Sequence, residues 1–388
     1  MKQRLGDLIC PAKIIRAQNT NLPVLSVTRH YGLVQQDTVF NKQIASRDTG
    51  KYLIVSPNQL VVGIHIDEGA LAFSDTSQRG IVSPAYRLWD IREPDKVFSP
   101  YLNRLIRSPE TVGYFGSHYR QTADRRGKIR PADFLALPVF LPPVPEQKRI
   151  AAILDASDAL RAKRRESIEQ LNSLVQATFL EMFGDPMTNP KRWEMGNIAD
   201  LMASVSYGTS KKANPAIGEF PILRMGNITY DGGWDLRDIK FIDLDKKEQG
   251  KYLVRGGELL FNRTNSKELV GKTAVYRGDT PMAFAGYLVR AVTNERASPE
   301  YVGAFMNARQ TKSMLQNMCK AIVGMANINA SEFKMIRIPI PPRSLQDRFS
   351  SIVESIDHHK ARLQSHLAEL DTLFSSLQSR AFNGELVA

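Results

Sequence analysis

The chain has 388 residues, of which 43% are hydrophobic and 24% charged, as in globular proteins that are large enough for two or more cores. It has no run of about 18 apolar residues, and the apolar stretch of a secretory signal is missing, so we expect a cytoplasmic protein without membrane contact. Cys10 and Cys319 lie far apart and lack metal-ligand spacing, which argues against a disulfide framework and a zinc site.

The formal net charge of +12 is unevenly distributed along the chain. Residues 1–143 hold 19 Lys and Arg against 12 Asp and Glu, and residues 184–340 hold 22 against 16. Residues 144–183 are balanced at 6 and 6, and residues 341–388 hold 5 against 6. A basic excess suits a polyanionic partner, although many basic proteins bind no polyanion. The two separate basic blocks are the more informative feature.

The first basic block, residues 1–143, is predicted to be of mixed α+β structure. Short β-branched runs such as "YLIVS" and "LVVGIHI" are bounded by Gly, Pro and Asn, as strands and turns require. Residues 98–117 begin at a Ser-Pro and are predicted to be helical. The segment "FLALPVFLP" is expected to form a closing strand that leads into the next element.

Residues 144–183 are predicted to form one long helix after the pair Pro142-Pro143, since proline is tolerated in a first helical turn. Its end is expected near "FGDP", where Gly suits a left-handed cap. The apolar residues expected to pack against another helix are Ile153, Leu160, Leu171 and Leu174.

Residues 184–340 repeat the character of the first block, with strands expected at "ELLFNR" and "TAVYR" and helix at residues 298–318. Residues 341–388 are predicted to form a second long helix. Its expected packing residues are Ile356, Leu363, Leu367, Leu370 and Phe374. Such a narrow apolar seam favours mutual packing of the two helices. The alternative is two unrelated helices, each covering its own domain.

An internal repeat relates the two halves of the chain. The segment "LPPVPEQKRIAAILDASDAL" (141–160) aligns with "IPPRSLQDRFSSIVESIDHH" (340–359), and the same offset of 199 pairs Gln147 with Gln346 and Phe183 with Phe382. The sequence therefore predicts an α+β protein with four parts: blocks 1–143 and 184–340, and helices 144–183 and 341–388.

No catalytic centre is predicted. The "GKT" at residues 271–273 lacks the glycine that a phosphate-binding loop needs five positions earlier, where Ser266 stands. Asp95 with Glu146 and Lys148 is reminiscent of a nuclease site, but the repeat partners of the latter two, Leu345 and Asp347, do not preserve it. Neither a methyl-transfer motif nor a glycine-rich cofactor fingerprint is present. We expect no catalytic residues, no metal and no cofactor.

The arrangement resembles the specificity subunits of type I restriction-modification systems over nearly the whole chain. The resemblance rests on the two "PP" plus "Q.R" helix starts, on the "FGDP" and "FNGEL" helix ends, and on the blocks between them. It implies that each block is a target recognition domain for one half of a split double-stranded DNA site. It also implies an antiparallel coiled coil that sets the spacing and docks two methyltransferase subunits, to which two restriction (helicase-nuclease) subunits can be added.

The resemblance also suggests DNA-contacting residues. The family's strand-then-arginine pattern is matched by "GELLFNRTN" (257–265), which implies roles for Arg263 and Asn265, whereas the repeat places Ile64 opposite Arg263. Other candidates are basic, polar or aromatic residues in expected loops. In the second block they are Lys211, Lys212, Arg224, Asn227, Lys267 and Lys320, and in the first block Arg29, His30, Arg79, Tyr86, Arg125, Arg126 and Lys128.

Two alternatives remain open at this stage. One is a specificity-like subunit of another DNA-modification or phage-defence system, which neighbouring genes would distinguish. The other is a standalone restriction-modification enzyme, which would need the missing methyl-transfer motif. The basic cluster "RAKRR" (161–165) in the first helix is expected either to touch DNA or a partner, or to be a solvated face.

Overall fold

The computed structural model describes residues 2–18, 20–39, 49–74, 79–122, 129–322 and 325–386. The chain divides into two compact units. Unit 1 combines Met1–Arg164 with His366–Ala388, and unit 2 is Arg165–Ser365. Each unit therefore contains one of the two predicted blocks.

Unit 1 has a four-stranded antiparallel sheet in the order β2-β9-β6-β7, and shorter ladders join β1 to β10, β3 to β4 and β5 to β8. The strands are β1 (Lys2–Arg4), β2 (Ile9–Pro11), β3 (Leu25–Thr28), β4 (Gly32–Gln35), β5 (Leu53–Val55), β6 (Leu60–Val62), β7 (Leu71–Phe73), β8 (Gly80–Val82), β9 (Arg87–Ile91) and β10 (Pro138–Phe140). The helices are α1 (Leu5–Leu8), α2 (Gln36–Val39), α3 (Ser99–Ile106), α4 (Pro109–Thr122) and α5 (Pro131–Leu135). Burial of the β-branched runs on these strands fixes their register.

Unit 2 has the corresponding antiparallel sheet β12-β20-β16-β18, a mixed sheet β14-β13-β19-β15 and the ladder β17-β22-β21. Its strands are β11 (Glu194–Asn197), β12 (Met202–Tyr207), β13 (Phe220–Leu223), β14 (Lys240–Ile242), β15 (Leu253–Val254), β16 (Leu259–Asn262), β17 (Thr264–Asn265), β18 (Thr273–Val275), β19 (Met282–Phe284), β20 (Leu288–Thr293), β21 (Lys320–Ile322), β22 (Met325–Asn327) and β23 (Arg337–Ile340). Its shorter helices are α7 (Lys246–Tyr252), α8 (Pro299–Asn307), α9 (Arg309–Met318) and α10 (Ala330–Lys334).

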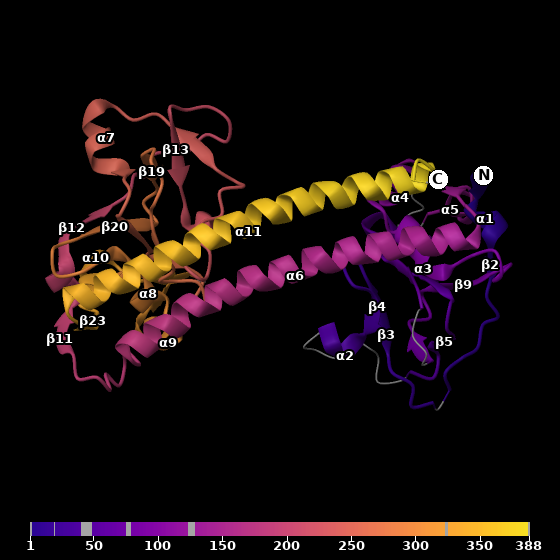
Figure 1. Ribbon diagram of the computed structural model, residues 1–388, viewed down its shortest axis with the longest axis horizontal. Coiled ribbons are helices and arrows are strands. Elements are labelled where there is room, and N and C mark those ends of the chain that lie inside the picture. Colours follow the sequence, from indigo (N-terminus) through magenta and orange to yellow (C-terminus); the bar gives the residue numbers. More distant parts are fainter. Residues whose placement is uncertain are drawn as a thin grey trace. The chain divides into compact units, whose positions relative to one another are not determined.

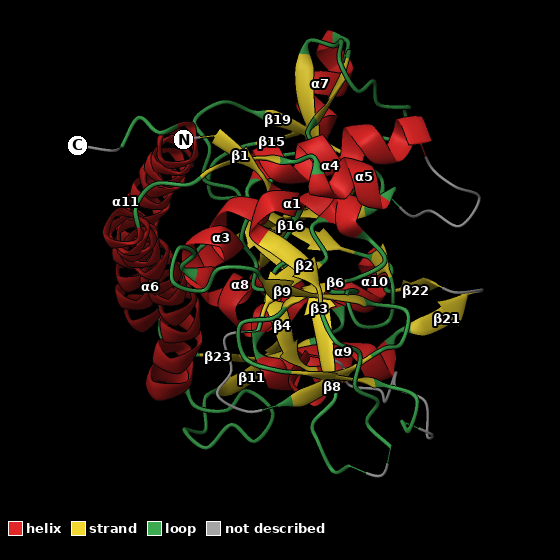
Figure 2. Ribbon diagram, turned by 90° about the vertical axis from the view of Figure 1, so that its right-hand side faces the viewer, coloured by secondary structure: helices red, strands yellow, loops and turns green. Residues whose placement is uncertain are grey.

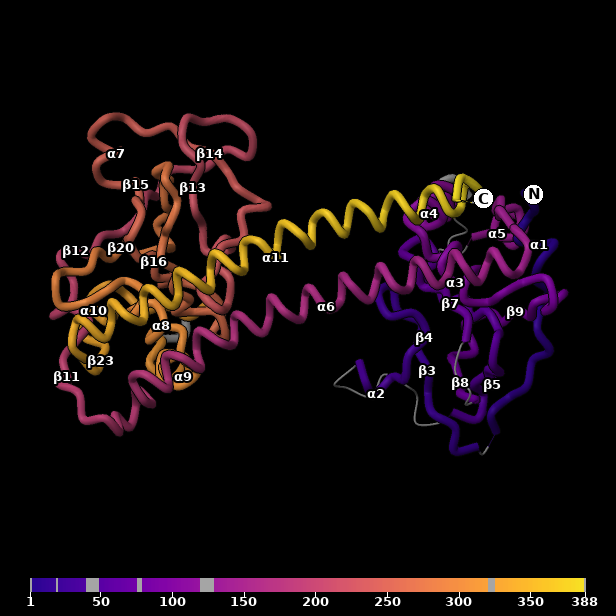
Figure 3. The backbone as a smooth tube through the Cα atoms, in the orientation of Figure 1, coloured from indigo at the N-terminus to yellow at the C-terminus, as the bar shows by residue number. Residues whose placement is uncertain are grey.

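The two long helices are α6 (Val144–Phe183) and α11 (Arg343–Asn383), which lie side by side in the views of Figures 1 and 2. In sequence α6 follows β10, and α11 follows β23, which lies beside the start of α11 in Figure 3. The start of α6 and the end of α11 belong to unit 1, and the end of α6 and the start of α11 belong to unit 2. The helices are thus antiparallel, and the predicted α+β fold with two β-rich domains and two long helices is confirmed.

Each unit completes its core with residues from both long helices. In unit 1, Leu154 of α6 and Phe382 of α11 belong to the same buried cluster as Tyr101. In unit 2, Phe183 of α6 and Phe349 of α11 lie 5.4 Å apart between ring centroids. Both helices end in a glycine with left-handed backbone, Gly184 at φ +83° and Gly384 at φ +84°, as the sequence predicted.

The seam between the helices differs from the predicted one on α6. Leu160 and Leu174 are 55% and 46% exposed, so these two residues are not packing residues, and that prediction was wrong. The seam instead includes Leu154, Ser157, Ile168 and Arg161, whose partner Asp371 lies on α11. A count of apolar positions passes over Ser157 and Arg161 because both are polar. Ile153 and Leu171 are half-buried. On α11, Ile356 and Leu363 are buried, and Leu367, Leu370 and Phe374 are half-buried.

The repeated glutamines fasten each long helix to its own block. Gln147 and Gln346 are both 0% exposed, and each makes three hydrogen bonds. Gln147 accepts from the Phe98 amide (2.8 Å) and donates to the carbonyls of Lys96 (2.8 Å) and Pro142 (2.7 Å). Gln346 accepts from the Ser298 amide (2.9 Å) and donates to the carbonyls of Arg296 (3.0 Å) and Pro341 (2.9 Å). The repeated sequence motif therefore produces the same set of three hydrogen bonds in each unit, which we call the glutamine tie.

Candidate nucleic-acid interface

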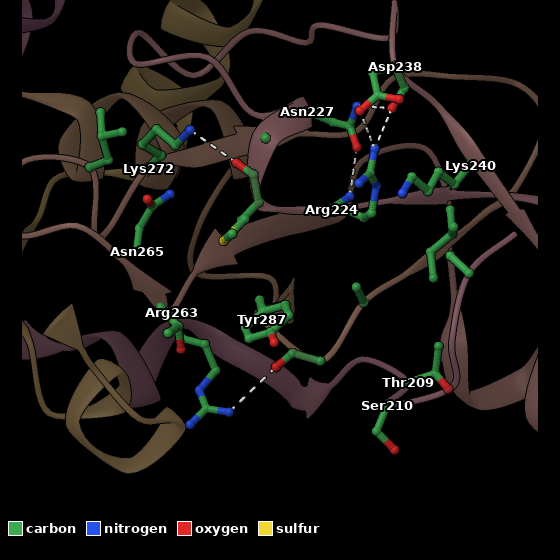
Figure 4. Close-up of a pocket in the computed structure, with 18 of the residues that line it drawn as sticks. Thr209, Ser210, Arg224, Asn227, Asp238, Lys240, Arg263, Asn265, Lys272 and Tyr287 are labelled. Carbon is green, nitrogen blue, oxygen red and sulfur yellow. Dashed lines mark hydrogen bonds and ion pairs between the residues drawn. The ribbon is translucent and has the colours of Figure 1, made fainter. Parts of the chain in front are cut away.

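Unit 2 contains a broad groove of about 1520 Å³, shown in Figure 4. Seven Lys and Arg residues line it against two Asp residues, so the groove carries positive charge. The basic residues are Lys211, Lys212, Arg224, Arg237, Lys240, Arg263 and Lys272. A groove with this balance favours an anionic ligand of extended shape.

One wall of the groove is the segment between β13 and β14. Arg224 donates to the carboxylate of Asp238 at 2.8 Å, and this bond lowers the pKa of Asp238. Asn227 is only 3% exposed, because its side-chain oxygen accepts from the Arg224 amide (2.8 Å) and its Nδ2 donates to the Asp235 carbonyl (2.8 Å). The side chain of Asn227 therefore stabilises the backbone of this wall next to Arg224.

Two buried lysines support the same wall from inside. The Lys272 ammonium donates to the carbonyls of Met225 (3.0 Å) and Ile228, and burial lowers its pKa. The Lys312 ammonium donates to the Tyr230 carbonyl and lies 3.5 Å from the centroid of the Tyr230 ring. Burial lowers the pKa of Lys312 to about 8, with Asp231 opposing this effect. The carbonyl partners compensate part of the desolvation of both cations.

The opposite wall begins where β12 ends. Gly208 passes so close to β19 that a Cβ atom would lie 2.3 Å from the carbonyl oxygens of Phe284 and Ala285, so only glycine fits. This close approach positions Lys211, whose ammonium pairs with Glu248 of α7 at 2.6 Å, an ion pair that raises its pKa. The neighbouring Lys212 is exposed.

Arg263 and Asn265 lie on the chain between β16 and the end of β17. The Arg263 guanidinium stacks on the Tyr207 ring at 4.9 Å, and its Nη1 donates to the Gly286 carbonyl at 3.5 Å. Asn265 accepts from the Ser266 amide through its side-chain oxygen at 2.9 Å. Both side chains are half-buried in the groove.

The structure thus brings together six of the eight residues predicted in the second block: Lys211, Lys212, Arg224, Asn227, Arg263 and Asn265. Lys267 is exposed on a turn and is not among the described lining residues. Lys320 starts β21, but its side chain lies outside the described part of the structure. Sequence reasoning missed Arg237, Lys240 and Lys272, and the signal for Lys272 was the "GKT" that fails as a phosphate-binding loop.

The candidates of the first block do not gather in a comparable groove within the described residues. Arg29 and His30 are exposed at the tip of the β3–β4 hairpin, where both of their carbonyls accept from Arg107 (3.0 and 3.1 Å). Arg79 is exposed directly before β8. Tyr86 is half-buried against a core cluster, and burial raises its pKa. Arg125, Arg126 and Lys128 lie outside the described residues.

The basic cluster of α6 contributes to helix packing in unit 1. Arg161 pairs with Asp371 of α11 at 2.6 Å, and its guanidinium lies 4.3 Å from the centroid of the Phe374 ring. Arg161 also pairs with Asp158 on its own helix at 2.8 Å. At least this member of the cluster is therefore a seam residue.

Comparisons with known proteins show what this chain is similar to. The family model "Type I restriction modification DNA specificity domain" matches residues 190–370. The EcoKI specificity subunit of Escherichia coli K12 is 26% identical over 67% of this chain and 60% of its own length. The putative MjaX specificity subunit of Methanocaldococcus jannaschii is 24% identical over 50% of this chain and 46% of its own length. The matches thus span less than two thirds of these two relatives.

A third relative is matched over more of its length. The StySPI specificity subunit of Salmonella potsdam is 24% identical over 97% of this chain and 82% of its own length. A solved chain from a study of type I restriction-modification complex assembly shares the fold, with a TM-score of 0.59, 15% identity and 100% and 98% of the two chains covered. The specificity subunit from M. genitalium gives a TM-score of 0.54 at 12% identity, covering 98% of this chain and 96% of that chain.

The chain consists of two α+β units, and each unit contains the start of one long helix and the end of the other. This is the architecture of a protein built from two repeated modules, and the module of unit 2 carries a basic groove. Residues 190–370 match the type I restriction modification DNA specificity domain, and the chain is similar to type I restriction enzyme specificity subunits. Within the described residues, no helix is long and apolar enough to cross a membrane.

Proposed function

We propose that this chain is the non-catalytic subunit that selects the DNA target of a type I restriction-modification complex. Each unit reads one half of a split double-stranded site, and the paired helices set the distance between the halves. The complex also contains two methyltransferase subunits docked on the helices and two restriction subunits. The match of residues 190–370 to the DNA specificity domain supports this assignment, as does the separation of basic charge into two blocks.

The observation that carries the proposal is the groove of unit 2. Six residues chosen from scattered positions in the sequence line one groove, together with further basic residues. Lys211 and Lys212 are exposed lining residues, and exposed ammonium groups suit phosphates, while Arg263 and Asn265 are half-buried lining residues whose donors and acceptors suit base edges. In unit 1, the exposed hairpin tip with Arg29 and His30 is the counterpart that we propose for the other half-site. Arg79 and Tyr86 remain additional candidates there.

The experiment compares two double variants that remove the same charge. Lys211→Ala with Lys212→Ala should weaken DNA binding and lower the slope of log K against log salt concentration by about two. The control, Lys246→Ala with Lys247→Ala, removes two exposed lysines on α7 outside the described groove lining and should leave the slope nearly unchanged. Equal loss of slope in both variants would contradict the groove as the DNA-binding surface. Methyl transfer or cleavage by the purified chain alone would contradict the non-catalytic role.

A further inference from the structure

Arg263 differs from the other arginines of the groove in its electrostatic partners. Arg224 pairs with Asp238 at 2.8 Å, and Arg237 pairs with Asp235 at 2.5 Å. Among the described residues, none of the ion pairs includes Arg263. Its positive charge is therefore not neutralised by a carboxylate of the described chain and remains available to an anionic or electron-rich ligand.

The backbone of Arg263 is held on both sides. Its amide donates to the Tyr287 carbonyl at 3.0 Å, and its carbonyl accepts from the Ile328 amide at 2.9 Å. The residue joins β16 to β17, so the Cα–Cβ direction is fixed by two strands. This rigidity suits a side chain that must present its donors in one geometry.

The guanidinium itself is held but not saturated. The Tyr207 ring supports its face, and Nη1 has a single long bond of 3.5 Å to the Gly286 carbonyl. The buried Nε has no hydrogen-bond partner within the described structure. A guanidinium carries five N–H donors in a planar fork, so most of them are unused here. A ligand with two adjacent acceptors would satisfy this fork.

The side chains that line the groove with Arg263 indicate whether its ligand is a base edge or a phosphate. Leu269, Tyr287 and Met325 line the same groove and are 37%, 51% and 40% exposed. Exposed apolar side chains favour a flat, weakly hydrated base edge, whereas a phosphate retains its strong hydration. An exposed lysine such as Lys212 is better suited to a hydrated phosphate.

We propose that Arg263 reads a guanine in the half-site of unit 2 and that Tyr207 is the positioning residue for its guanidinium. This inference rests on the proposed DNA-selecting function. Guanine is the base that presents two adjacent acceptors, O6 and N7, in the major groove, and a bidentate arginine matches them. Pre-organisation on Tyr207 reduces the side-chain entropy lost when the two bonds form.

The first experiment selects binding sequences from a randomised DNA duplex library with the full-length chain. We expect the wild-type selection to contain a guanine that disappears in the selection with Arg263→Ala and with Arg263→Lys. Bases of the other half-site should be unchanged. A uniform loss of affinity for all sequences, with a shallower salt dependence, would show a phosphate contact and overturn the assignment.

The second experiment changes one atom of the DNA. Replacing the identified guanine by 7-deazaguanine removes the N7 acceptor and should weaken wild-type binding by about 10-fold or more, but not binding by Arg263→Ala. An equal effect on both proteins would contradict the contact. Failure of the wild-type chain to select any sequence would instead overturn the proposed function itself, so the two failures are distinguishable.

The third experiment tests the role of Tyr207. Its hydroxyl accepts from the Ala330 amide at 2.9 Å, so Tyr207→Phe loses this bond but keeps the aromatic face, and Tyr207→Leu loses both. We expect guanine preference to survive in Tyr207→Phe and to weaken in Tyr207→Leu. Equal losses of preference in the two variants would show that Tyr207 acts through its hydroxyl bond alone and would refute the platform role.

Discussion

At the residue scale, one wall of the groove of unit 2 depends on two buried cations. Lys272 and Lys312 are 7% and 6% exposed, and their ammonium groups bind backbone carbonyls of the wall segment. Neither lysine donates to a carboxylate among the described residues. Charge and position in the sequence alone do not distinguish a buried lysine that holds the backbone from a lysine that binds DNA.

The lowered pKa of Lys312 predicts a specific dependence of stability on pH. The folded pKa of about 8 lies below the usual value of 10.5, so between these values the unfolded chain binds more protons than the folded chain. The free energy of unfolding of the wild type, relative to that of Lys312→Met, should therefore rise with pH by up to about 1.4 kcal/mol per pH unit. Chemical denaturation of both proteins from pH 7 to 10 measures this difference.

Lys334→Met is the matched control for that measurement, because Lys334 is an exposed lysine on α10. Its stability difference from the wild type should stay nearly constant over the same pH range. A constant difference for Lys312→Met as well would refute the idea that a charged lysine is held at a desolvation cost in the folded protein.

Part of the lining of the candidate site was predictable from residue type, expected loop position and the family pattern. Lys211 and Lys212 were predicted as basic residues in an expected loop, and Arg263 and Asn265 were predicted from the strand-then-arginine pattern of the family that the sequence resembles; all four line the groove. The buried role of Lys272 was not predictable, since it depends on carbonyls that come from residues more than 40 positions away.

At the element scale, the repeat predicted the helices well and the packing seam only partly. Leu160 and Leu174 continue an apolar spacing, yet the observed seam passes through Ser157 and Arg161. A polar residue enters a helix seam when tertiary partners satisfy it, as Asp371 and Phe374 do for Arg161. Those partners lie more than 200 residues away, so helical periodicity within α6 cannot reveal them.

The glutamine ties give the repeated motif a measurable energetic role. Gln346→Leu removes three hydrogen bonds and leaves the buried Ser298 amide without its acceptor. We expect a loss of about 2–4 kcal/mol in the free energy of unfolding. Urea denaturation checks this value, and Gln147→Leu should show a similar loss through unit 1.

Gln364→Leu provides the control for the tie, because Gln364 is exposed on the same helix α11. This substitution should change stability by less than about 0.5 kcal/mol. Similar losses for Gln364→Leu and Gln346→Leu would mean that the effect arises from the helix surface and not from the tie.

At the scale of the whole molecule, the proposed function makes helix length a determinant of the DNA spacer. A matched insertion of three heptads in both α6 and α11 preserves the seam and adds about 31 Å. One turn of DNA is about 34 Å or 10 base pairs. The preferred spacer should therefore lengthen by about 9–10 base pairs, with the half-site bases unchanged.

Binding selection with graded spacers measures this change. A single matched heptad is the informative comparison, because it adds about 10 Å, or about three base pairs, and turns the second half-site by about 100° on the DNA. It should bind every spacer weakly. An unchanged optimum after the insertion of three heptads would exclude the helices as the spacing element.

The division of the chain between the units also determines the order in which they can form on the ribosome. Unit 2 is one continuous stretch, Arg165–Ser365, whereas unit 1 needs His366–Ala388, which are synthesised after unit 2. Ala381 and Phe382 are buried in the core that contains Tyr101, so the earlier-synthesised block must wait for them with an open hydrophobic surface. The block of residues 1–143 therefore cannot complete its core before unit 2 has been synthesised, and its apolar surface is open to proteases and chaperones until then.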